Sequence, residues 1–440
     1  MMKTVQSAAF WISIYLLLVL APLLILTLGD VPSGSGFWWD FSMALGFAAM
    51  AMMSVQFLLT ARFRRASAPF GIDIIYYFHR YLALIAIALV LLHFVIIRIN
   101  YTDALGAINP LQAPWHMTAG RISFVLLTLL VISSLLRKQL RIHYDEWRML
   151  HIGMAMTGFV LALAHIEGVG YYINAPAKHW LWTAYTLFWL FLIVYLRLIK
   201  PWQMHKKPYK VLEVKAERGN SWTLALAPDG HEGLSFKPGQ FAWLTLRHSP
   251  WHIKEHPFSF SSSAASRGRL EFTIKELGDF TRTIKDIQPG ETAYLDGPYG
   301  AFSTDFYPDA PGFVFIAGGV GVAPVISMLR TLADRGDQRS IWFIDCNNNW
   351  QDVLFREELE TLKQRLNLHL IHVLNEPPHD WQGESGFITP QLLRRTLPDD
   401  LQQYEYFLCG PKAMSEKVQQ GLHDMKVPLA RIHFELFDMV

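Results

Sequence analysis

Residues 74–97 read IIYYFHRYLALIAIALVLLHFVII, an apolar stretch long enough to cross a membrane, with histidines at positions 79 and 93. A second stretch, residues 147–167, reads WRMLHIGMAMTGFVLALAHIE and carries histidines at positions 151 and 165, again fourteen residues apart. Fourteen residues advance an α-helix by about 21 Å and turn it by almost a whole number of revolutions, so each pair lies along one helix face. Two such helices side by side would present two facing histidine pairs at different depths.

Facing imidazoles at matched depths predict axial ligation of haem iron. A six-coordinate haem needs one imidazole on each side of the porphyrin, so His79 with His151 and His93 with His165 predict two haems. The alternative for a single histidine is a packed or interfacial side chain, but ionisable groups inside a membrane are costly and usually functional. Four histidines at a repeated spacing therefore favour ligation.

The composition agrees with a membrane protein that has no nucleic-acid partner. Of 440 residues, 52% are hydrophobic and 17% charged, the mean hydropathy is +0.20, and the net charge is only +2. The two cysteines, Cys346 and Cys409, form no CxxC or CxxCH motif. This argues against a four-cysteine iron–sulfur cluster and against covalent haem attachment, so any haem is expected to be b-type.

Six apolar stretches, at about residues 8–28, 38–61, 74–97, 120–137, 147–167 and 180–199, predict six membrane-spanning helices. Basic residues follow the even-numbered stretches: Arg62, Arg64 and Arg65; Arg137, Lys138 and Arg141; Lys200, Lys206 and Lys207. This distribution places both termini in the cytoplasm, and the first stretch is expected to be a retained helix, because it lacks a convincing small-residue cleavage site.

This topology gives the histidine pairs an orientation. The third and fifth helices both run outward, so His79 and His151 lie near the cytoplasmic face and His93 and His165 towards the outer face. Other histidines fall in predicted loops or helix ends, where solvated side chains are expected: His116, His143 and His179. Three arginines at helix ends could pair with haem propionates or simply snorkel to the interface: Arg80, Arg98 and Arg121.

After Pro201 the pattern changes to strands and turns. Segments 209–217, 222–227, 240–246 and 270–275 alternate as half-buried strands and predict a small antiparallel barrel. From about residue 311, strands at 313–317, 341–345, 368–373 and 404–408 alternate with helices near 322–335, 351–364, 388–395 and 411–424, which predicts a parallel α/β domain. The expected domains are a membrane bundle (1–200), a linker (201–207), a barrel (208–305) and an α/β domain (306–440).

A glycine cluster, Gly318-Gly319-Val320-Gly321, follows the first predicted strand of the α/β domain and opens a helix. Glycines let the backbone approach a pyrophosphate, and the free N–H groups of a helix start bind anions. A tight turn is the alternative for the glycines alone, but the strand-to-helix placement favours a nucleotide site.

Several motifs in fixed order resemble one family. They are His256-Pro257-Phe258-Ser259, Gly278-Asp279-Phe280-Thr281, Asp296-Gly297-Pro298-Tyr299-Gly300, the glycine cluster, Cys409-Gly410-Pro411 and Glu435-Leu436-Phe437. Together they resemble the ferredoxin-reductase-type flavin module of NADPH oxidases and ferric reductases, and the membrane half, with its histidine spacing, resembles the same family. The implied fold is a multidomain membrane protein: a six-helix haem-binding bundle, an antiparallel β-barrel FAD domain and an α/β parallel-sheet nucleotide-binding domain.

The resemblance also implies roles for single residues. His256 and Pro257 would contact FAD, Phe258 and Ser259 would face the isoalloxazine, and Lys275, Gly278 and Thr281 would surround the FAD pyrophosphate. Gly318, Gly319 and Gly321 would hold the nicotinamide dinucleotide, with Cys409 and Gly410 near its reactive ring. Phe437 would cover the flavin face that the nicotinamide must reach, and Glu435 would support the site. Without the motif series, Cys409 and Phe437 would be interpreted as core residues.

The choice of coenzyme stays open. No Arg or Lys in the segment from Asp345 to Asp352 could meet a 2′-phosphate; Arg356 is the first candidate, and Asp345 could instead accept a hydrogen bond from an unphosphorylated ribose.

The predicted function is electron transfer from cytoplasmic NAD(P)H through FAD and two b-type haems to an acceptor outside. Oxygen, giving superoxide, is favoured over a ferric chelate because the outer loops contain no cluster of carboxylates or cysteines. A six-helix transporter or proton channel with a soluble regulatory domain is the alternative from another class. The expected location is a bacterial inner membrane, with the flavin domain cytoplasmic, no calcium control and no obligate protein partner.

Overall fold

The computed structural model describes residues 2–28, 36–63, 72–252, 254–266, 268–397 and 401–435. The chain divides into two compact units, Met1–Pro201 and Trp202–Val440. Each unit is described by itself.

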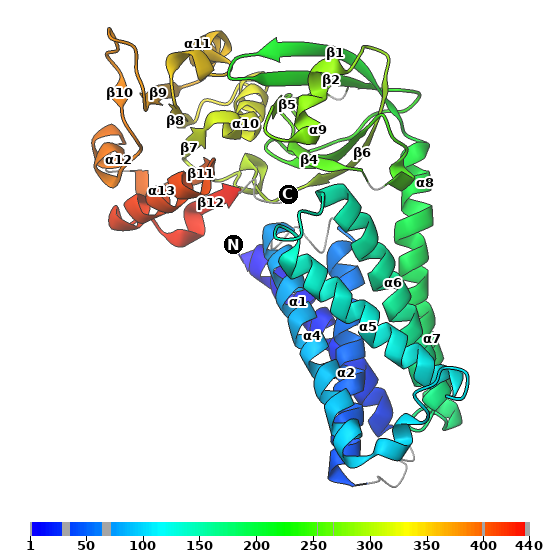
Figure 1. Cartoon of the computed structure of the whole chain (residues 1–440). Coiled ribbons are helices and arrows are strands. Elements are labelled where there is room, and N and C mark those ends of the chain that lie inside the picture. The colour runs from blue at the N-terminus through cyan, green and yellow to red at the C-terminus, as the bar shows by residue number, and fades with distance from the viewer. Residues whose placement is uncertain are drawn as a thin grey trace. The chain divides into compact units, whose positions relative to one another are not determined.

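The first unit is a helical bundle (Figure 1). Its helices are α1 (Met2–Thr27), α2 (Phe37–Thr60), α4 (Ile72–Asn100), α5 (Trp115–Leu136), α6 (Tyr144–Val169) and α7 (Pro176–Val194), which continues through a π-helical turn (Tyr195–Ile199) into α8 (Lys200–His205). Six helical segments are long and apolar enough to cross a membrane, as the sequence predicted. The fourth begins five residues earlier than its predicted start, because the turn before its apolar run, which includes His116, is already helical.

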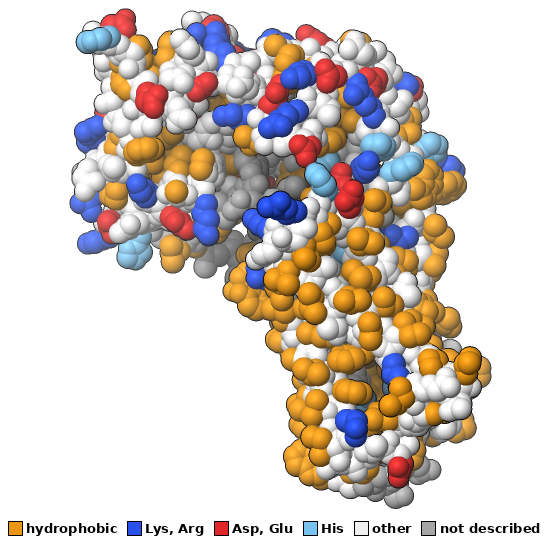
Figure 2. Space-filling model, viewed as in Figure 1, with side chains coloured by type: hydrophobic (Ala, Val, Ile, Leu, Met, Phe, Trp, Pro, Cys, Tyr) orange, Lys and Arg blue, Asp and Glu red, His pale blue; other side chains and the backbone are white. Residues whose placement is uncertain are grey.

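Two helix pairs carry the histidines. Helix α2 packs along α4, and α5 packs along α6, whereas α1 lies against α2 and α7. Large side chains such as Phe47, Phe159, Trp182 and Trp189 fill the core between α2, α6 and α7. Figure 2 shows hydrophobic side chains covering the visible face of this unit, as expected where lipid replaces water.

The second unit begins with an antiparallel sheet that curls into a barrel. Its strands are β1 (Tyr209–Glu217), β2 (Ser221–Pro228), β3 (Phe241–Leu246), β4 (His256–Ser259), β5 (Leu270–Lys275) and β6 (Thr292–Tyr299), in the order β4-β3-β6-β1-β2-β5. A bridge between Phe260 and Phe272 brings the two edge strands together. Inward residues such as Leu224, Leu244 and Phe272 are fully buried, which matches the predicted alternation.

The rest of this unit is a parallel sheet of order β10-β9-β8-β7-β11-β12. Its strands are β7 (Gly312–Gly318), β8 (Ser340–Asn347), β9 (Leu368–Leu374), β10 (Glu384–Ser385), β11 (Glu405–Cys409) and β12 (Ile432–Glu435). Phe313 and Phe315 of β7 pack with α10 (Val322–Asp334) and α11 (Arg356–Arg365), while Val314 and Ile316 pack with α12 (Pro390–Thr396) and α13 (Lys412–Asp424). The helices therefore cover both faces, as the strand and helix alternation predicted.

Candidate functional site

His79 on α4 and His151 on α6 face each other inside the bundle. Their ring centroids are 6.2 Å apart, at an interplanar angle of 55°. Imidazole nitrogens bind metal ions at about 2 Å, so this separation leaves room for one ion between the two rings. The structure therefore brings together the two residues that the sequence paired at this depth.

The second histidine pair has its Nδ1 atoms fixed by backbone carbonyls. His93 Nδ1 lies 2.8 Å from the carbonyl oxygen of Ser42 on α2, and His165 Nδ1 lies 3.0 Å from that of His116 on α5. A carbonyl can only accept, so each Nδ1 donates a proton. The other ring nitrogen, Nε2, then carries the lone pair that a metal requires.

The same tautomer follows for His151. Ser134 Oγ donates to the carbonyl oxygen of Leu130 at 2.6 Å, so it accepts the proton of His151 Nδ1 at 3.2 Å. His79 Nδ1 is buried and has no hydrogen-bond partner among the described residues. All four rings are half-buried rather than sealed in a packed core. The Nδ1 contacts leave Nε2 of His93, His151 and His165 able to bind a metal ion.

The remaining histidines and arginines of the bundle lie at helix ends. His143 precedes α6, and His116 and His179 lie in the first turns of α5 and α7. Arg121 donates to the backbone carbonyls of Leu105 and Ala107, so it holds the loop before α5. The sequence predicted that Arg121 either pairs with a haem propionate or snorkels to the membrane interface; the observed contact with the loop is neither of these.

The predicted flavin motif forms strand β4. It pairs with β3, so that His256 lies opposite Leu244 and Ser259 opposite Phe241. The His256 ring stacks on Phe280 with centroids 3.8 Å apart. Ser259 Oγ is buried without a hydrogen-bond partner among the described residues. Buried hydroxyl groups are usually hydrogen-bonded, so this one is available to bind a ligand.

The second predicted flavin loop folds on itself. Thr281 Oγ1 accepts hydrogen bonds from the backbone N–H groups of Leu277 and Gly278, both at 2.8 Å, and donates to the Gly278 carbonyl. Lys275, which the resemblance also assigned to the FAD pyrophosphate, lines a cavity together with the glycine cluster.

That glycine cluster packs against the loop that follows β11. A Cβ atom on Gly321 would lie 2.2 Å from the carbonyl oxygen of Cys409, and one on Gly410 would lie 3.1 Å from the Gly318 nitrogen. Gly319 has a φ of 54° and open space around its Cα. Glycine alone permits these approaches without displacing the backbone. All four glycines line a cavity of about 540 Å³.

Cationic side chains surround this cavity. Lys412 and Lys417 of α13 line it, as does Lys275 of β5, and the glycine cluster leads into the N-terminus of α10. A helix N-terminus with nearby cations suits a pyrophosphate. The sequence interpretation missed both α13 lysines, although their position just after Cys409-Gly410-Pro411 could have indicated them.

Three further lining residues bear on the choice of coenzyme. They are Asn347, Asn348 and Asp352, whereas Asp345 is buried in the sheet with a carboxylate oxygen 3.1 Å from His372 Nδ1. Arg356 stacks over the Trp350 ring. In the segment from Asp345 to Asp352, the polar side chains that line the cavity are thus two amides and one carboxylate, which the sequence interpretation did not assign to the site.

The C-terminal edge brings Glu435 to the barrel. Glu435 pairs in register with Cys409, and a Cβ atom on Gly300 would lie 3.6 Å from Glu435 Oε1. Phe241, which is opposite Ser259 on β4, also pairs with Tyr299 on β6. Residues from four of the predicted motifs therefore gather at this edge. Phe437 lies outside the described residues.

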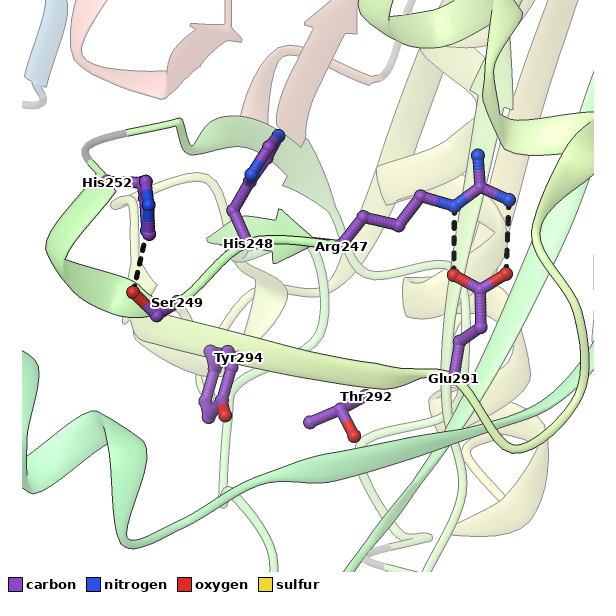
Figure 3. Close-up of a pocket in the computed structure, with 7 residues that line it drawn as sticks. All are labelled: Arg247, His248, Ser249, His252, Glu291, Thr292 and Tyr294. Carbon is purple, nitrogen blue, oxygen red and sulfur yellow. Dashed lines mark hydrogen bonds and ion pairs between the residues drawn. The ribbon is translucent and has the colours of Figure 1, made fainter.

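A second pocket of about 400 Å³ lies at the ends of β3 and β6 (Figure 3). Arg247 makes a two-pronged ion pair with Glu291, and Ser249 Oγ lies 2.7 Å from His252 Nδ1. These groups bind one another, and none belongs to the predicted motifs. The larger cavity is therefore the candidate nucleotide site.

Comparisons with known proteins identify three domains in order. Residues 45–163 match the family described as ferric reductase like transmembrane component, residues 207–303 match an FAD-binding domain, and residues 315–420 match an oxidoreductase NAD-binding domain.

Curated relatives match part of the chain. NADH-cytochrome b5 reductase 1 of Laccaria bicolor is 34% identical over 185 residues, which are 40% of this chain and 58% of that protein. The reductase component of propane 2-monooxygenase from Rhodococcus jostii is 31% identical over 224 residues, or 49% and 59% of the two chains. The chain thus spans less than two thirds of the length of these relatives.

Among solved structures, the flavohemoglobin of Malassezia yamatoensis, with bound FAD and heme, aligns with 92% of this chain and 100% of its own. The TM-score is 0.50 and the identity 16%, so this likeness concerns the fold alone. The family resemblance and the fold class predicted from the sequence are confirmed by the three domain matches. The chain is therefore a multi-pass membrane protein with an FAD-binding and an NAD-binding domain, and this is the domain architecture of NADPH oxidases and ferric reductases.

Proposed function

We propose that this protein transfers electrons from NAD(P)H through FAD and two b-type haems to oxygen on the opposite side of a membrane. The observation that carries the proposal is the facing pair His79 and His151, with ring centroids 6.2 Å apart, in a chain that also has FAD- and NAD-binding domains. A transporter or channel would have no use for this combination.

The lining of the larger cavity supports nucleotide-binding roles for residues of the second unit. Gly318, Gly319 and Gly321 would let the coenzyme backbone approach the start of α10, and Lys412 and Lys417 would balance its phosphate charge. Cys409 ends the neighbouring strand and Gly410 follows it, next to Gly318 and Gly321, where the nicotinamide would lie. This arrangement would direct the nicotinamide towards the barrel.

The barrel would hold the flavin. His256 and Pro257 would contact FAD, Phe258 would face its ring system, and the buried hydroxyl of Ser259 would hydrogen-bond to the ring. Glu435 is positioned beside Gly300 to support this region. Gly278 and Thr281 would shape the loop beside the flavin phosphates, and Phe437 would cover the exposed ring face.

The overall reaction balances without a proton donor in the membrane. One NAD(P)H gives up a hydride, which is two electrons and a proton; two molecules of O2 each gain one electron, and the products are NAD(P)⁺, two superoxide ions and one proton. When bound, FAD supplies the conversion from a two-electron donor to one-electron acceptors, and each haem carries one electron at a time. With chelated Fe(III) as acceptor, two ferrous ions would replace the two superoxide ions.

The residues of the bundle would hold the haem irons. His79 and His151 would bind the inner one, and His93 and His165 the outer one, each through Nε2. The hydrogen bonds at Nδ1 of His93, His151 and His165 would fix the ring orientations.

The location that we propose is a bacterial inner membrane, with both termini and the flavin domain in the cytoplasm. Arginines and lysines follow the even-numbered membrane helices, which supports this orientation. Outward movement of an electron then runs with an inside-negative potential, which contributes about 2.3 kcal/mol per 100 mV for a full crossing.

Turnover of the purified full-length protein tests the proposal. A reduced b-type haem spectrum is expected after addition of NADH or NADPH, together with cytochrome c reduction that superoxide dismutase suppresses. Absence of a b-type Soret band in protein purified from haem-replete cells would exclude the haem path. Cytochrome c reduction that persists fully with dismutase would exclude superoxide, and reduction of a ferric chelate under anaerobic conditions would then identify the metal as acceptor.

A further inference from the structure

Two matching sets of contacts surround the outer histidines. On α2, the carbonyl of Ser42 accepts from His93 Nδ1, and Gly46, one turn later, lies against the His93 ring. On α5, the carbonyl of His116 accepts from His165 Nδ1, and Gly120, again four residues later, lies against the His165 ring. Each outer histidine thus rests on a carbonyl and a glycine of the adjacent helix, an arrangement that we call the carbonyl–glycine cradle.

Among the described residues, this carbonyl–glycine arrangement is found at His93 and His165 and not at His79 or His151. The three nearest atoms to a Cβ on Gly46 are all in the His93 ring, at 3.5 to 3.7 Å, and those for Gly120 are all in the His165 ring, at 2.8 to 3.1 Å. No described glycine has the ring of His79 or His151 as such a neighbour. The partner of His151 is instead the rotatable hydroxyl of Ser134.

We propose that Gly46 and Gly120 are positioning residues of the outer haem site, which rests on the haem ligation proposed above. At position 120 the missing side chain lets the His165 imidazole approach the adjacent helix, whereas at position 46 a single methyl group would still fit and only a larger side chain would displace His93. The carbonyl one turn earlier then holds Nδ1 and leaves Nε2 directed at the iron. A backbone carbonyl cannot rotate away as a hydroxyl can, so the outer ligands are held more rigidly than the inner ones.

Simple helix packing is the competing explanation, because small residues let membrane helices approach closely. Gly158 on α6 illustrates that role: a Cβ there would lie 3.0 Å from Leu127 Cγ on α5 and meet no histidine among its nearest atoms. Gly158→Ala therefore perturbs the same α5–α6 interface without touching a ligand. Gly153→Ala, where nothing lies within 4 Å, serves as the neutral substitution on α6.

The distances predict unequal effects within the cradles. A methyl group at position 120 would lie 2.8 Å from His165 Nδ1, which forces the ring to move, whereas one at position 46 would make ordinary contact with His93 at 3.5 Å. Gly120→Ala should reduce the haem-to-FAD ratio from two to one and remove one low-spin signal from the electron paramagnetic resonance spectrum. Gly46→Ala should keep both haems.

The measurement uses the full-length protein in detergent, with haem content, spectra and NADH-dependent flavin reduction recorded for every variant. Gly158→Ala is expected to lower thermal stability with both haems retained, and Gly120→Ala to retain flavin reduction. Two haems with wild-type spectra and midpoint potentials in Gly120→Ala would overturn the proposal. Equal loss of one haem in Gly158→Ala would overturn it too, since packing would then explain the result.

Gly46→Val keeps the proposal falsifiable if Gly120→Ala does not fold. A Cβ atom at position 46 would already lie in contact with His93 Nδ1, at 3.5 Å, so the two further methyl groups of valine would crowd that ring. A shifted spectrum and potential of one haem in Gly46→Val support the cradle, and unchanged values for both haems contradict it. Wild-type protein without haem would instead refute the proposed function.

Discussion

His79 and His151 lie on two helices that are separated by α5 in the chain, yet their imidazole rings face each other with centroids 6.2 Å apart. Helix α4 is paired with α2, and α6 with α5, so the two rings project from different helix pairs. Two ligands on separate helix pairs can bind one iron between them, and binding would then tie the two pairs together.

Removal of one inner ligand should empty one haem site. His151→Leu is expected to halve the haem content, because an iron with one remaining imidazole loses its six-coordinate site. NADH-dependent FAD reduction should remain, since it takes place in the second unit. His143→Leu, just before α6, is the matched control. Full haem content in His151→Leu would contradict the assignment.

Ser259→Ala should slow flavin reduction without unfolding the protein. The hydroxyl is buried but has no hydrogen-bond partner among the described residues, so its loss removes no hydrogen bond of the described structure. If it binds the flavin, the loss of about 1.4 kcal/mol from one hydrogen bond slows hydride transfer about tenfold. Stopped-flow reduction by NADH measures this rate, with the exposed Ser266→Ala as control. A wild-type rate in Ser259→Ala would exclude the contact.

Gly321→Ala should damage the nucleotide site. The added Cβ would lie 2.2 Å from the Cys409 carbonyl oxygen, a backbone atom held in β11, so the two loops must separate. Overpacking of this kind costs about 1–3 kcal/mol of unfolding free energy. Thermal unfolding and the KM for NADH should both report the change. Gly268→Ala, which meets nothing within 4 Å, should match the wild type in both measurements.

Asn348→Arg should shift coenzyme preference towards NADPH. Asn348 lines the cavity together with Asn347 and Asp352, and none of these three side chains is a cation that could pair with a 2′-phosphate. A guanidinium there should raise the ratio of kcat/KM for NADPH to that for NADH by about tenfold, equivalent to about 1.4 kcal/mol. Gln338→Arg adds the same charge on an exposed turn away from the cavity. An equal shift in that control would indicate a general charge effect.

Alkylation of Cys346 should be slow at neutral pH. Burial, with a smaller contribution from the Asp345 carboxylate, raises the pKa of the Cys346 thiol well above its usual range. The reactive thiolate is therefore scarce at pH 7, and labelling by iodoacetamide should accelerate as the pH rises. Mass spectrometry of native and guanidinium-unfolded protein gives the two rates. Native labelling at pH 7 as fast as in the unfolded chain would contradict this prediction.

The order and kind of the elements could be predicted because they depend on local patterns. Apolar length predicted the six helices, and strand alternation predicted the barrel and the α/β domain. Strand β12 was not predicted, since Ile432–Glu435 spans only four residues, too few for its apolar and polar alternation to stand out; the strand is held by parallel pairing with β11. The start of α5 was missed because Trp115 to Thr118 precede the apolar run.

The sequence by itself determined the spacing of the histidines along one face of each helix and the order of the flavin and nucleotide motifs, because helical period and chain order define both. Only the tertiary structure decided what each residue touches. In the folded chain the Asp345 carboxylate lies beside His372, and Arg121 donates hydrogen bonds to the loop before α5. The carbonyl of Ser42 accepts a hydrogen bond from His93, and that of His116 accepts one from His165. These partners lie up to 51 residues apart, and packing between helices or strands, which no local period encodes, brings them together.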